Sequence, residues 1–220
     1  MACPSITQYD LVQTGVQIGG EDRFFCSALL YCKLHIEQGQ TMPQPTYAIT
    51  APPTLWLTGL SGAGKTSIAQ ALEQQLRAEG VAVFVLDGDV LRQGLNRDLG
   101  FAPGDRRENI RRTAEVARLM NQAGVLVIAA LISPYREDRS MAGEIIGAAQ
   151  FIEVHVSTPV EVCEARDPKG LYARARAGEL PQFTGVSAPY EAPLAPALSL
   201  DTGLLSLDEA VALLLRHLVG

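Results

Sequence analysis

From Thr54 onward, short apolar runs alternate with amphipathic stretches. Apolar runs of strand length predict β-strands, and apolar residues that recur every three or four positions predict helices. Strands are expected at TLWLTG (54–59), VAVFVLDGD (81–89), VLVIAALIS (125–133) and FIEVHVS (151–157), and helices at 65–79, 108–124 and 207–218. Gly80 and Gly124 are expected to end the first two helices. Alternating strands and helices indicate a parallel sheet covered by helices on both faces, a three-layer α/β sandwich.

The first fifty residues do not share this order. They hold three of the four cysteines and lead into a proline-rich stretch, MPQPTYAITAPP, at 42–53. A short helix is expected around FFCSALLYCKLH (24–35). We interpret 1–50 as an N-terminal extension or linker and 51–220 as one domain. Because Met42 directly precedes the linker, a mis-assigned upstream start is an alternative interpretation.

Composition narrows the class of protein. The chain has 220 residues, 47% hydrophobic and 19% charged, which suits one globular domain. No apolar run approaches the roughly 18–20 residues that span a bilayer, and no secretory signal is evident, so we expect a soluble cytoplasmic protein. The net charge of −6 disfavours nucleic acid or an anionic membrane as partner.

The cysteines suggest no chemistry of their own. Their spacing matches neither a zinc ribbon nor a redox pair, so we expect reduced thiols, with Cys163 buried and inert. A metal site at Cys26, Cys32 and His35 is the less favoured alternative.

Residues 59–66 fit the phosphate-loop pattern G-x-x-x-x-G-K-[ST], between a predicted strand and a predicted helix. Glycines let the backbone wrap around phosphate oxygens, and the helix N-terminus directs amides at them. Lys65 is expected to reach the β- and γ-phosphates and Thr66 to bind Mg²⁺. The alternative is a glycine-rich turn that fits by accident. The ATP-binding set is Gly59, Leu60, Ser61, Gly62, Ala63, Gly64, Lys65, Thr66 and Ser67.

Two acids, Asp87 and Asp89, end the second predicted strand. Ligands of open parallel sheets gather at the carboxyl ends of the strands, so both acids should face the same crevice as the loop. Asp89 is the candidate to orient or deprotonate an attacking hydroxyl, and Asp87 to hold Mg²⁺ through water. The alternative is an ordinary polar turn, since Asp-Gly is common in turns.

Longer segments carry a family resemblance. The run DGDVLRQGLNRDLGFAPGDRRENIRRTAEVARLMNQAG from 87 is followed by ISPYREDR (132–139), CEARDPKGLYARARAGELPQFTG (163–185) and SAPYEAP (187–193). In this order the segments resemble the adenylylsulfate kinase (APS kinase) family over about residues 52–215. The resemblance implies a P-loop NTPase-type fold and transfer of a phosphoryl group from ATP, with Mg²⁺, to the ribose 3′-hydroxyl of adenosine 5′-phosphosulfate (APS).

The resemblance also implies an acceptor site. Its members would be Asp89, Arg92, Phe101, Arg106, Asn109, Ile132, Ser133, Lys169, Phe183, Thr184 and Gly185. Phe101 would stack on the substrate adenine and the arginines would bind the phosphosulfate, as planar guanidinium groups suit such oxygens. Ser133, which precedes a proline, has the alternative role of shaping a turn.

The arginines are not all equally informative. Residues 92–118 hold seven arginines and four acids, a cationic island in an acidic protein. Arg111, Arg112 and Arg118 have acids three or four positions away, so we expect them to be solvated or ion-paired. Arg92 and Arg106 are therefore the preferred anion-binding candidates. The basic stretch 166–176 is expected to be a mobile lid that excludes water, and a basic surface helix is the alternative.

The sequence departs from the family at Val90, where Asn is usual, and at SMAGEI (140–145), where a further Arg is usual. Neither departure touches the loop or Asp89. The predicted product is 3′-phosphoadenylylsulfate (PAPS), with ADP, in sulfate assimilation. The resemblance favours a homodimer and a functional link to ATP sulfurylase. The alternatives are a P-loop kinase for another small acceptor and a catalytically silent nucleotide-binding protein.

Overall fold

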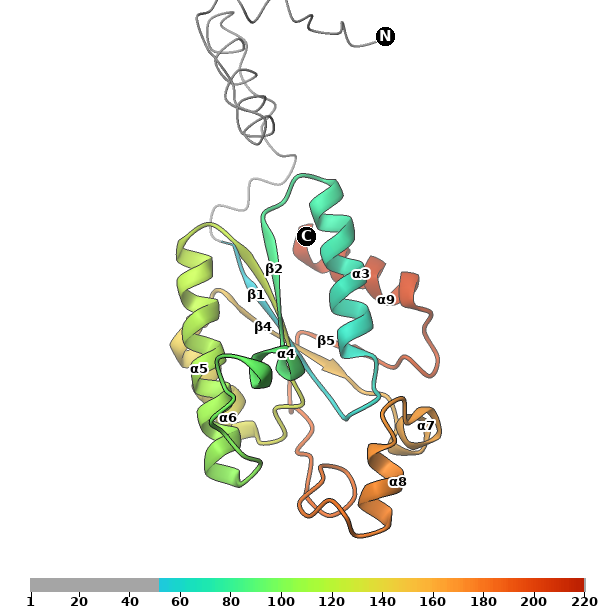
Figure 1. The fold of residues 1–220 in the computed structure, drawn as a ribbon. Coiled ribbons are helices and arrows are strands. Elements are labelled where there is room, and N and C mark those ends of the chain that lie inside the picture. The colour runs from blue at the N-terminus through green and yellow to red at the C-terminus, as the bar shows by residue number, and fades with distance from the viewer. Residues whose placement is uncertain (1–51, 220) are drawn as a thin grey trace, which may run out of the picture. The chain divides into compact units, whose positions relative to one another are not determined.

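A computed structural model describes residues 52–219, in which five parallel strands form one sheet (Figure 1). The order across the sheet is β2-β3-β1-β4-β5. The strands are β1 (Thr54–Thr58), β2 (Val83–Asp87), β3 (Leu126–Ala130), β4 (Phe151–Val156) and β5 (Leu198–Leu200). The extension 1–50, with its expected helix and Cys26, Cys32 and His35, lies outside the described residues.

The central strands are apolar because both of their faces are buried. Leu55 and Leu57 contribute to the core on one face, and Trp56 to the core on the other. All five residues of β1 and of β3 are buried. Continuous rather than alternating hydrophobicity is expected of a parallel sheet covered on both sides.

Helices cover both faces, as the sequence predicts (Figure 1). Helices α3 and α9 share the core of one face, and α5 and α6 share the core of the other. The helices are α3 (Lys65–Ala78), α4 (Gly88–Gln93), α5 (Pro103–Gln122), α6 (Arg136–Ile146), α7 (Val160–Arg166), α8 (Leu171–Arg176) and α9 (Leu207–Val219). Within 52–219, no helix is long and apolar enough to cross a bilayer.

The predicted elements recur with small shifts. Helix α3 ends at Ala78, before Gly80 with φ 81°. Helix α5 begins at Pro103, five residues before the expected start at 108, because proline suits the first helical position where no amide partner is needed. Strand β5 was not predicted, since three residues carry no readable period.

The strand ends define where the site lies. In the register of the sheet, Asp87 pairs with Ala130, and Ala130 pairs with Leu57, so the carboxyl ends of β2, β3 and β1 lie side by side. The loops that leave these ends are 59–64, the start of α4 and 131–135. This is the edge at which parallel sheets bind ligands.

Candidate active site

The loop 59–64 connects β1 to α3 in a path that requires glycine. A Cβ on Gly59 would lie 2.4 Å from the carbonyl oxygen of Val156. Gly64 has φ 98°, in the left-handed region that favours glycine, and α3 begins at the next residue. The free amides and the positive end of the helix dipole therefore lie at the loop, where an anion is stabilised.

Lys65 is buried against this loop. Its side-chain nitrogen donates to the carbonyl oxygens of Gly59 (2.9 Å) and Leu60 (2.7 Å), and the residue is 8% exposed. Burial lowers the pKa of Lys65 from 10.5 to about 8, against the opposing fields of Cys163, Asp89 and Asp87. A phosphate at the loop would favour the charged ammonium form.

Asp87 ties the end of β2 to the loop helix. Its Oδ2 accepts from Thr66 Oγ1 at 2.7 Å. Its Oδ1 accepts from the amides of Asp89 (2.8 Å) and Val90 (3.4 Å), so Asp87 caps α4. The segment thus starts a short helix instead of a plain turn. The hydroxyl and the carboxylate together offer the oxygen ligands that Mg²⁺ prefers.

Asp89 lies in different surroundings from Asp87. Its side chain is 65% exposed, and Asp87 is 9% exposed. The Asp89 carboxylate forms an ion pair with Lys169, which lies in the turn between α7 and α8 and is 56% exposed. The structure therefore brings together a candidate base and a cation from the predicted lid, 80 residues apart in sequence.

Arg92, Phe101 and Arg106 also come together. The guanidinium carbon of Arg92 lies 4.3 Å from the Phe101 ring centroid, and that of Arg106 lies 5.8 Å from it. Arg92 donates to the carbonyls of Gly100 (2.9 Å) and Leu99 (3.2 Å). Phe101 is 60% exposed, so an apolar ring with two cations close to it lies at the surface.

Arg106 connects the Phe101 ring to the segment 183–185 (FTG). It donates to the carbonyls of Phe101 (2.8 Å) and Gln182 (2.8 Å), and to the hydroxyl of Thr184 (3.1 Å). At the other end of the segment, a Cβ on Gly185 would lie 3.0 Å from the side chain of Leu60. The segment therefore reaches from the Arg106 side to the phosphate loop.

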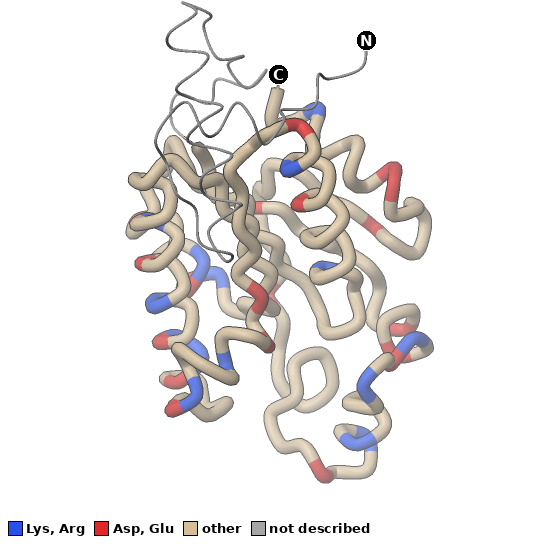
Figure 2. The backbone as a smooth tube through the Cα atoms, turned by 45° about the horizontal axis from the view of Figure 1, so that its top comes forward, with Lys and Arg blue, Asp and Glu red and all other residues tan. Residues whose placement is uncertain are grey.

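Three other arginines of the cationic island are ion-paired along α5. Acidic and basic residues alternate along α5 in Figure 2. Arg111 contacts Glu108, Arg118 contacts Glu115, and Arg112 contacts Glu108, all within one helical turn. This confirms the prediction for Arg111, Arg112 and Arg118.

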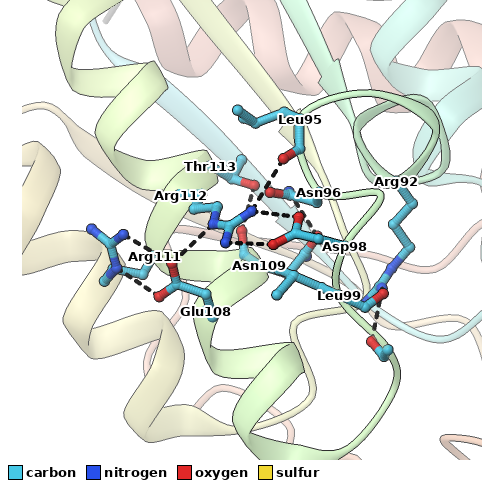
Figure 3. Close-up of polar contacts among 11 residues, drawn as sticks. Arg92, Leu95, Asn96, Asp98, Leu99, Glu108, Asn109, Arg111, Arg112 and Thr113 are labelled. Carbon is cyan, nitrogen blue, oxygen red and sulfur yellow. Dashed lines mark hydrogen bonds and ion pairs between the residues drawn. The ribbon is translucent and has the colours of Figure 1, made fainter.

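Arg112 has a second role that the sequence did not indicate. It donates to both carboxylate oxygens of Asp98 (2.7 and 2.9 Å) and to the Leu95 carbonyl, which fastens loop 94–100 to α5 (Figure 3). In the same loop, buried Asn96 donates to Asn109 Oδ1 at 2.9 Å. Asn109 was predicted to contact substrate. In the structure its side chain supports the loop that precedes Phe101, and a substrate contact stays a prediction.

Ile132 and Ser133 follow β3 at the same edge of the sheet. Ser133 is 2% exposed with φ 39°, and its hydroxyl accepts from Trp56 Nε1 at 3.1 Å. The carbonyl of Ile132 accepts from Thr58 Oγ1 at 2.8 Å. Both residues therefore shape the loop after β3 through buried bonds, which supports the turn-shaping alternative for Ser133. Their place in a substrate pocket stays a prediction.

The predicted lid, 166–176, consists of the last residue of α7, the turn 167–170 and α8. Its cations contact acids or backbone: Arg174 bonds Glu179, Arg176 bonds Glu164, and Arg166 bonds the carbonyl and hydroxyl of Thr202. Cys163, below the loop, is buried as expected.

Comparison with known proteins identifies the group to which this site belongs. The family model described as adenylylsulphate kinase matches residues 51–201. The chain belongs to the adenylylsulphate kinase family. An adenylyl-sulfate kinase of Shewanella amazonensis is 55% identical over 166 residues, which are 76% of this chain and 84% of that protein.

Solved structures of the family agree with the fold. An APS kinase from Mycobacterium tuberculosis, in complex with AMPPNP and APS, has a TM-score of 0.75 and 46% identity over 77% of this chain and 99% of that one. A hexameric APS kinase from Thiobacillus denitrificans has a TM-score of 0.58 and 28% identity over 93% of this chain and 37% of that one. The P-loop sandwich is therefore confirmed.

Two residues that contact the loop were not predicted from the sequence. Tyr172 donates its hydroxyl to the Ser61 carbonyl (3.0 Å), and Thr202 donates to the Ala63 carbonyl (2.9 Å). A tyrosine in a basic helix indicates only packing, and Thr202 follows the unpredicted strand β5. No sequence pattern at either position indicates a contact with the phosphate loop.

Proposed function

We propose that this chain transfers the γ-phosphoryl group of ATP to the ribose 3′-hydroxyl of APS, which gives PAPS and ADP in sulfate assimilation. The observation that carries the proposal is the Thr66–Asp87 hydrogen bond, which joins the phosphate-loop helix to the acidic segment. The bond supports the proposal because it holds the first turn of the phosphate-loop helix against the end of the strand that precedes Asp89, in a chain of the adenylylsulphate kinase family.

The donor would bind along residues 59–67. Loop amides and the α3 N-terminus would hold the phosphate oxygens, and Lys65 would exchange its bonds to Gly59 and Leu60 for bonds to the β- and γ-phosphates. Thr66 would hold Mg²⁺ directly and Asp87 would hold it through water, and the oxygen chemistry of both side chains fits the ion. Mg²⁺ would offset phosphate charge when bound.

The acceptor would bind on the side of Phe101. Its adenine would stack on the ring, and Arg92 and Arg106 would bind the phosphosulfate. Asn109, Ile132 and Ser133 complete the proposed acceptor set from α5 and the loop after β3.

Asp89 would accept a hydrogen bond from the 3′-hydroxyl and take its proton as the 3′-oxygen bonds to the γ-phosphorus. The bond from that phosphorus to the β–γ bridging oxygen breaks, and ADP leaves. Placement and electrostatic stabilisation supply most of the catalysis in such transfers. Lys169, bonded to Asp89, would hold the carboxylate toward the site until the acceptor arrives.

The segment from α7 to Gly185 would close over both nucleotides. Lys169, Phe183, Thr184 and Gly185 are the proposed contacts. Support comes from its bonds to both sides: Tyr172 donates to Ser61 in the phosphate loop, and on the acceptor side Lys169 reaches Asp89 and Thr184 accepts from Arg106. Closure excludes water, which would otherwise accept the phosphoryl group.

The test is ADP release from MgATP, measured with APS, with AMP as the matched acceptor that lacks sulfate, and with no acceptor. We expect fast release with APS alone, and a product whose mass and fragmentation place the new phosphate on the 3′-oxygen. Equal release with AMP, or release with no acceptor, would contradict the proposed acceptor.

Assembly and location are finer points of the same proposal. We propose a homodimer in the cytoplasm that receives APS from ATP sulfurylase, because the family resemblance favours it. The T. denitrificans relative is hexameric, so light scattering on the purified chain decides between two and six copies.

A further inference from the structure

The carbonyl groups of the phosphate loop are bonded, one after another, by side chains. Lys65 bonds the first two carbonyls, those of Gly59 and Leu60. The bonds to the next three are Tyr172 to Ser61 (3.0 Å), Arg166 to Gly62 (3.4 Å), and Thr158 and Thr202 to Ala63 (3.2 and 2.9 Å). The last three carbonyls, those of Ser61, Gly62 and Ala63, are therefore held by side chains that lie outside the loop.

These bonds fix the direction of the amides. A peptide group is planar and trans, so the N–H of one residue points away from the carbonyl of the residue before it. Holding the Ser61 and Ala63 carbonyls outward turns the amides of Gly62 and Gly64 the opposite way. Both glycines have positive φ, 75° and 98°, and glycine has more conformations to lose than any other residue. A loop of this kind needs restraint from its surroundings to stay in one form.

The donors are themselves held in place. Tyr172 on α8 is 1% exposed, and its ring packs edge-on against Phe183 with centroids 5.1 Å apart. Thr202 accepts from Arg166 at 2.7 Å and lies 2.9 Å from the hydroxyl of Thr158, which is 3% exposed. Tyr172 and Thr158 are buried and Thr202 is partly buried, and water cannot easily replace hydroxyls that several bonds and packed rings fix in this way.

We propose that Tyr172 and Thr202 are positioning residues for the phosphoryl donor: they hold the Ser61 and Ala63 carbonyls outward so that the amides of Gly62 and Gly64 face the triphosphate. The proposal rests on the function given above and deepens its donor half. Neither residue needs to touch the reacting atoms, because each acts through the loop backbone.

The experiment measures binding of MgATP and of inorganic tripolyphosphate, without acceptor, to wild type, Tyr172→Phe, Thr202→Val and Thr202→Ser. Tripolyphosphate has no base or sugar, so its binding reports the loop alone. We expect Tyr172→Phe and Thr202→Val each to weaken both probes about 5- to 10-fold, the loss of roughly one net hydrogen bond. Thr202→Ser keeps the hydroxyl and is expected to bind both probes within about 2-fold of wild type.

Steady-state kinetics give the second readout. For Tyr172→Phe and Thr202→Val we expect a raised KM for ATP and a lowered kcat, with the KM for APS unchanged. Thr54→Val is the matched control, because it removes a buried hydroxyl bond, 2.7 Å to Asn121, at the opposite end of β1. It should lower the melting temperature and leave tripolyphosphate binding unchanged.

Several results would overturn the proposal. One is a Thr202→Val variant that binds tripolyphosphate with the affinity of wild type. Another is an equal loss of tripolyphosphate affinity in Thr202→Ser and Thr202→Val. If Tyr172→Phe does not fold, the two Thr202 variants decide alone. Failure of the proposed function can be told apart from failure of this proposal. A wild-type chain that binds MgATP but does not phosphorylate APS would refute APS as the acceptor. The tripolyphosphate affinities of the variants would still test whether Tyr172 and Thr202 position the loop.

Discussion

On the donor side of the site, made of residues 59–66, Lys65 is 8% exposed, and the buried side chains of Tyr172 and Thr158 and the partly buried side chain of Thr202 bond the loop carbonyls. On the acceptor side, made of Asp89, Arg92, Phe101, Arg106 and Lys169, the side chains of Phe101, Asp89 and Lys169 are each more than half exposed. The donor side is thus formed by the fold itself. The acceptor side is an exposed set of charges around one aromatic ring.

The contacts of the acceptor side show what binding must exchange. Arg92 lies against the Phe101 ring, Arg106 is bonded to backbone carbonyls and Thr184, and Lys169 pairs with Asp89. These groups are the ones proposed to meet the adenine, the phosphosulfate and the 3′-hydroxyl. The acceptor must therefore replace contacts at each of these side chains, while the donor replaces the two bonds of Lys65 in a loop whose backbone is also held by Tyr172 and Thr202. Ordering of side chains on binding has a cost, so the acceptor side is the more adjustable half.

Asp89→Asn tests the chemical step and should have the largest effect. Loss of the carboxylate is expected to lower kcat about 10²- to 10⁴-fold, the range of general-base catalysis, with MgATP binding within about 2-fold of wild type. The measurement is PAPS formation beside MgATP affinity. Asp208→Asn, an exposed carboxylate in the first turn of α9, is the control and should keep wild-type turnover. Near-native turnover by Asp89→Asn would remove Asp89 from the mechanism.

Phe101→Ala tests whether the exposed ring stacks on the acceptor. Stacking of a base on an aromatic ring contributes about 1–3 kcal/mol, so the KM for APS should rise roughly 5- to 150-fold with the KM for ATP unchanged. Phe84→Ala on β2, where the ring is 44% exposed, is the aromatic control and should leave both constants unchanged. Equal increases in the KM for ATP and the KM for APS would mean that Phe101 does not belong to the acceptor side.

The donor side could be predicted from the sequence because its motif is contiguous. Eight residues, the loop 59–64 and the first two residues of α3, form the motif, and the structure places Lys65 and Thr66 at the start of that helix. The supports of the loop could not be predicted, because Tyr172 and Thr202 lie more than a hundred residues away and depend on α8 and the end of β5.

The acceptor side could be predicted less well. Its members came from a family resemblance, and their geometry depends on how loop 94–100 folds onto α5. The Arg112–Asp98 bonds join residues 14 positions apart, a separation that no helical or strand period reveals. The Lys169–Asp89 pair spans 80 positions. Local acids correctly indicated that Arg112 is ion-paired, and they could not show that one of its partners lies in a loop.

Arg112→Gln tests this loop anchor. It removes the bonds to Asp98 and the Leu95 carbonyl, so Phe101 should be less well placed. We expect the KM for APS to rise about 3- to 10-fold with kcat nearly unchanged, since small misplacements of binding groups are costly. Arg111→Gln is the matched control, because Arg111 contacts the same Glu108 but has no bond to the loop. If both variants raise the KM for APS equally, the effect comes from charge on α5 and not from the bonds that anchor the loop.

Glu108→Gln should have the smallest effect, on stability instead of kinetics. Hydrogen bonds from Arg111 and then Arg112 lower the pKa of the Glu108 carboxyl from 4.5 to about 2. A depressed carboxyl pKa stabilises the fold above the unfolded value, and this stabilisation is lost as pH falls from about 4.5 through 2. Because the pairs are partly exposed, the variant should be less stable by at most about 1 kcal/mol at pH 7. Urea unfolding of both proteins at pH 7, 5, 4 and 3 should show the difference shrinking below pH 4.5, and 1 M salt should shrink it at pH 7. If the difference in free energy of unfolding changes with neither pH nor salt, Glu108 acts through packing. The acceptor side would then depend less on exposed charge than its contacts indicate.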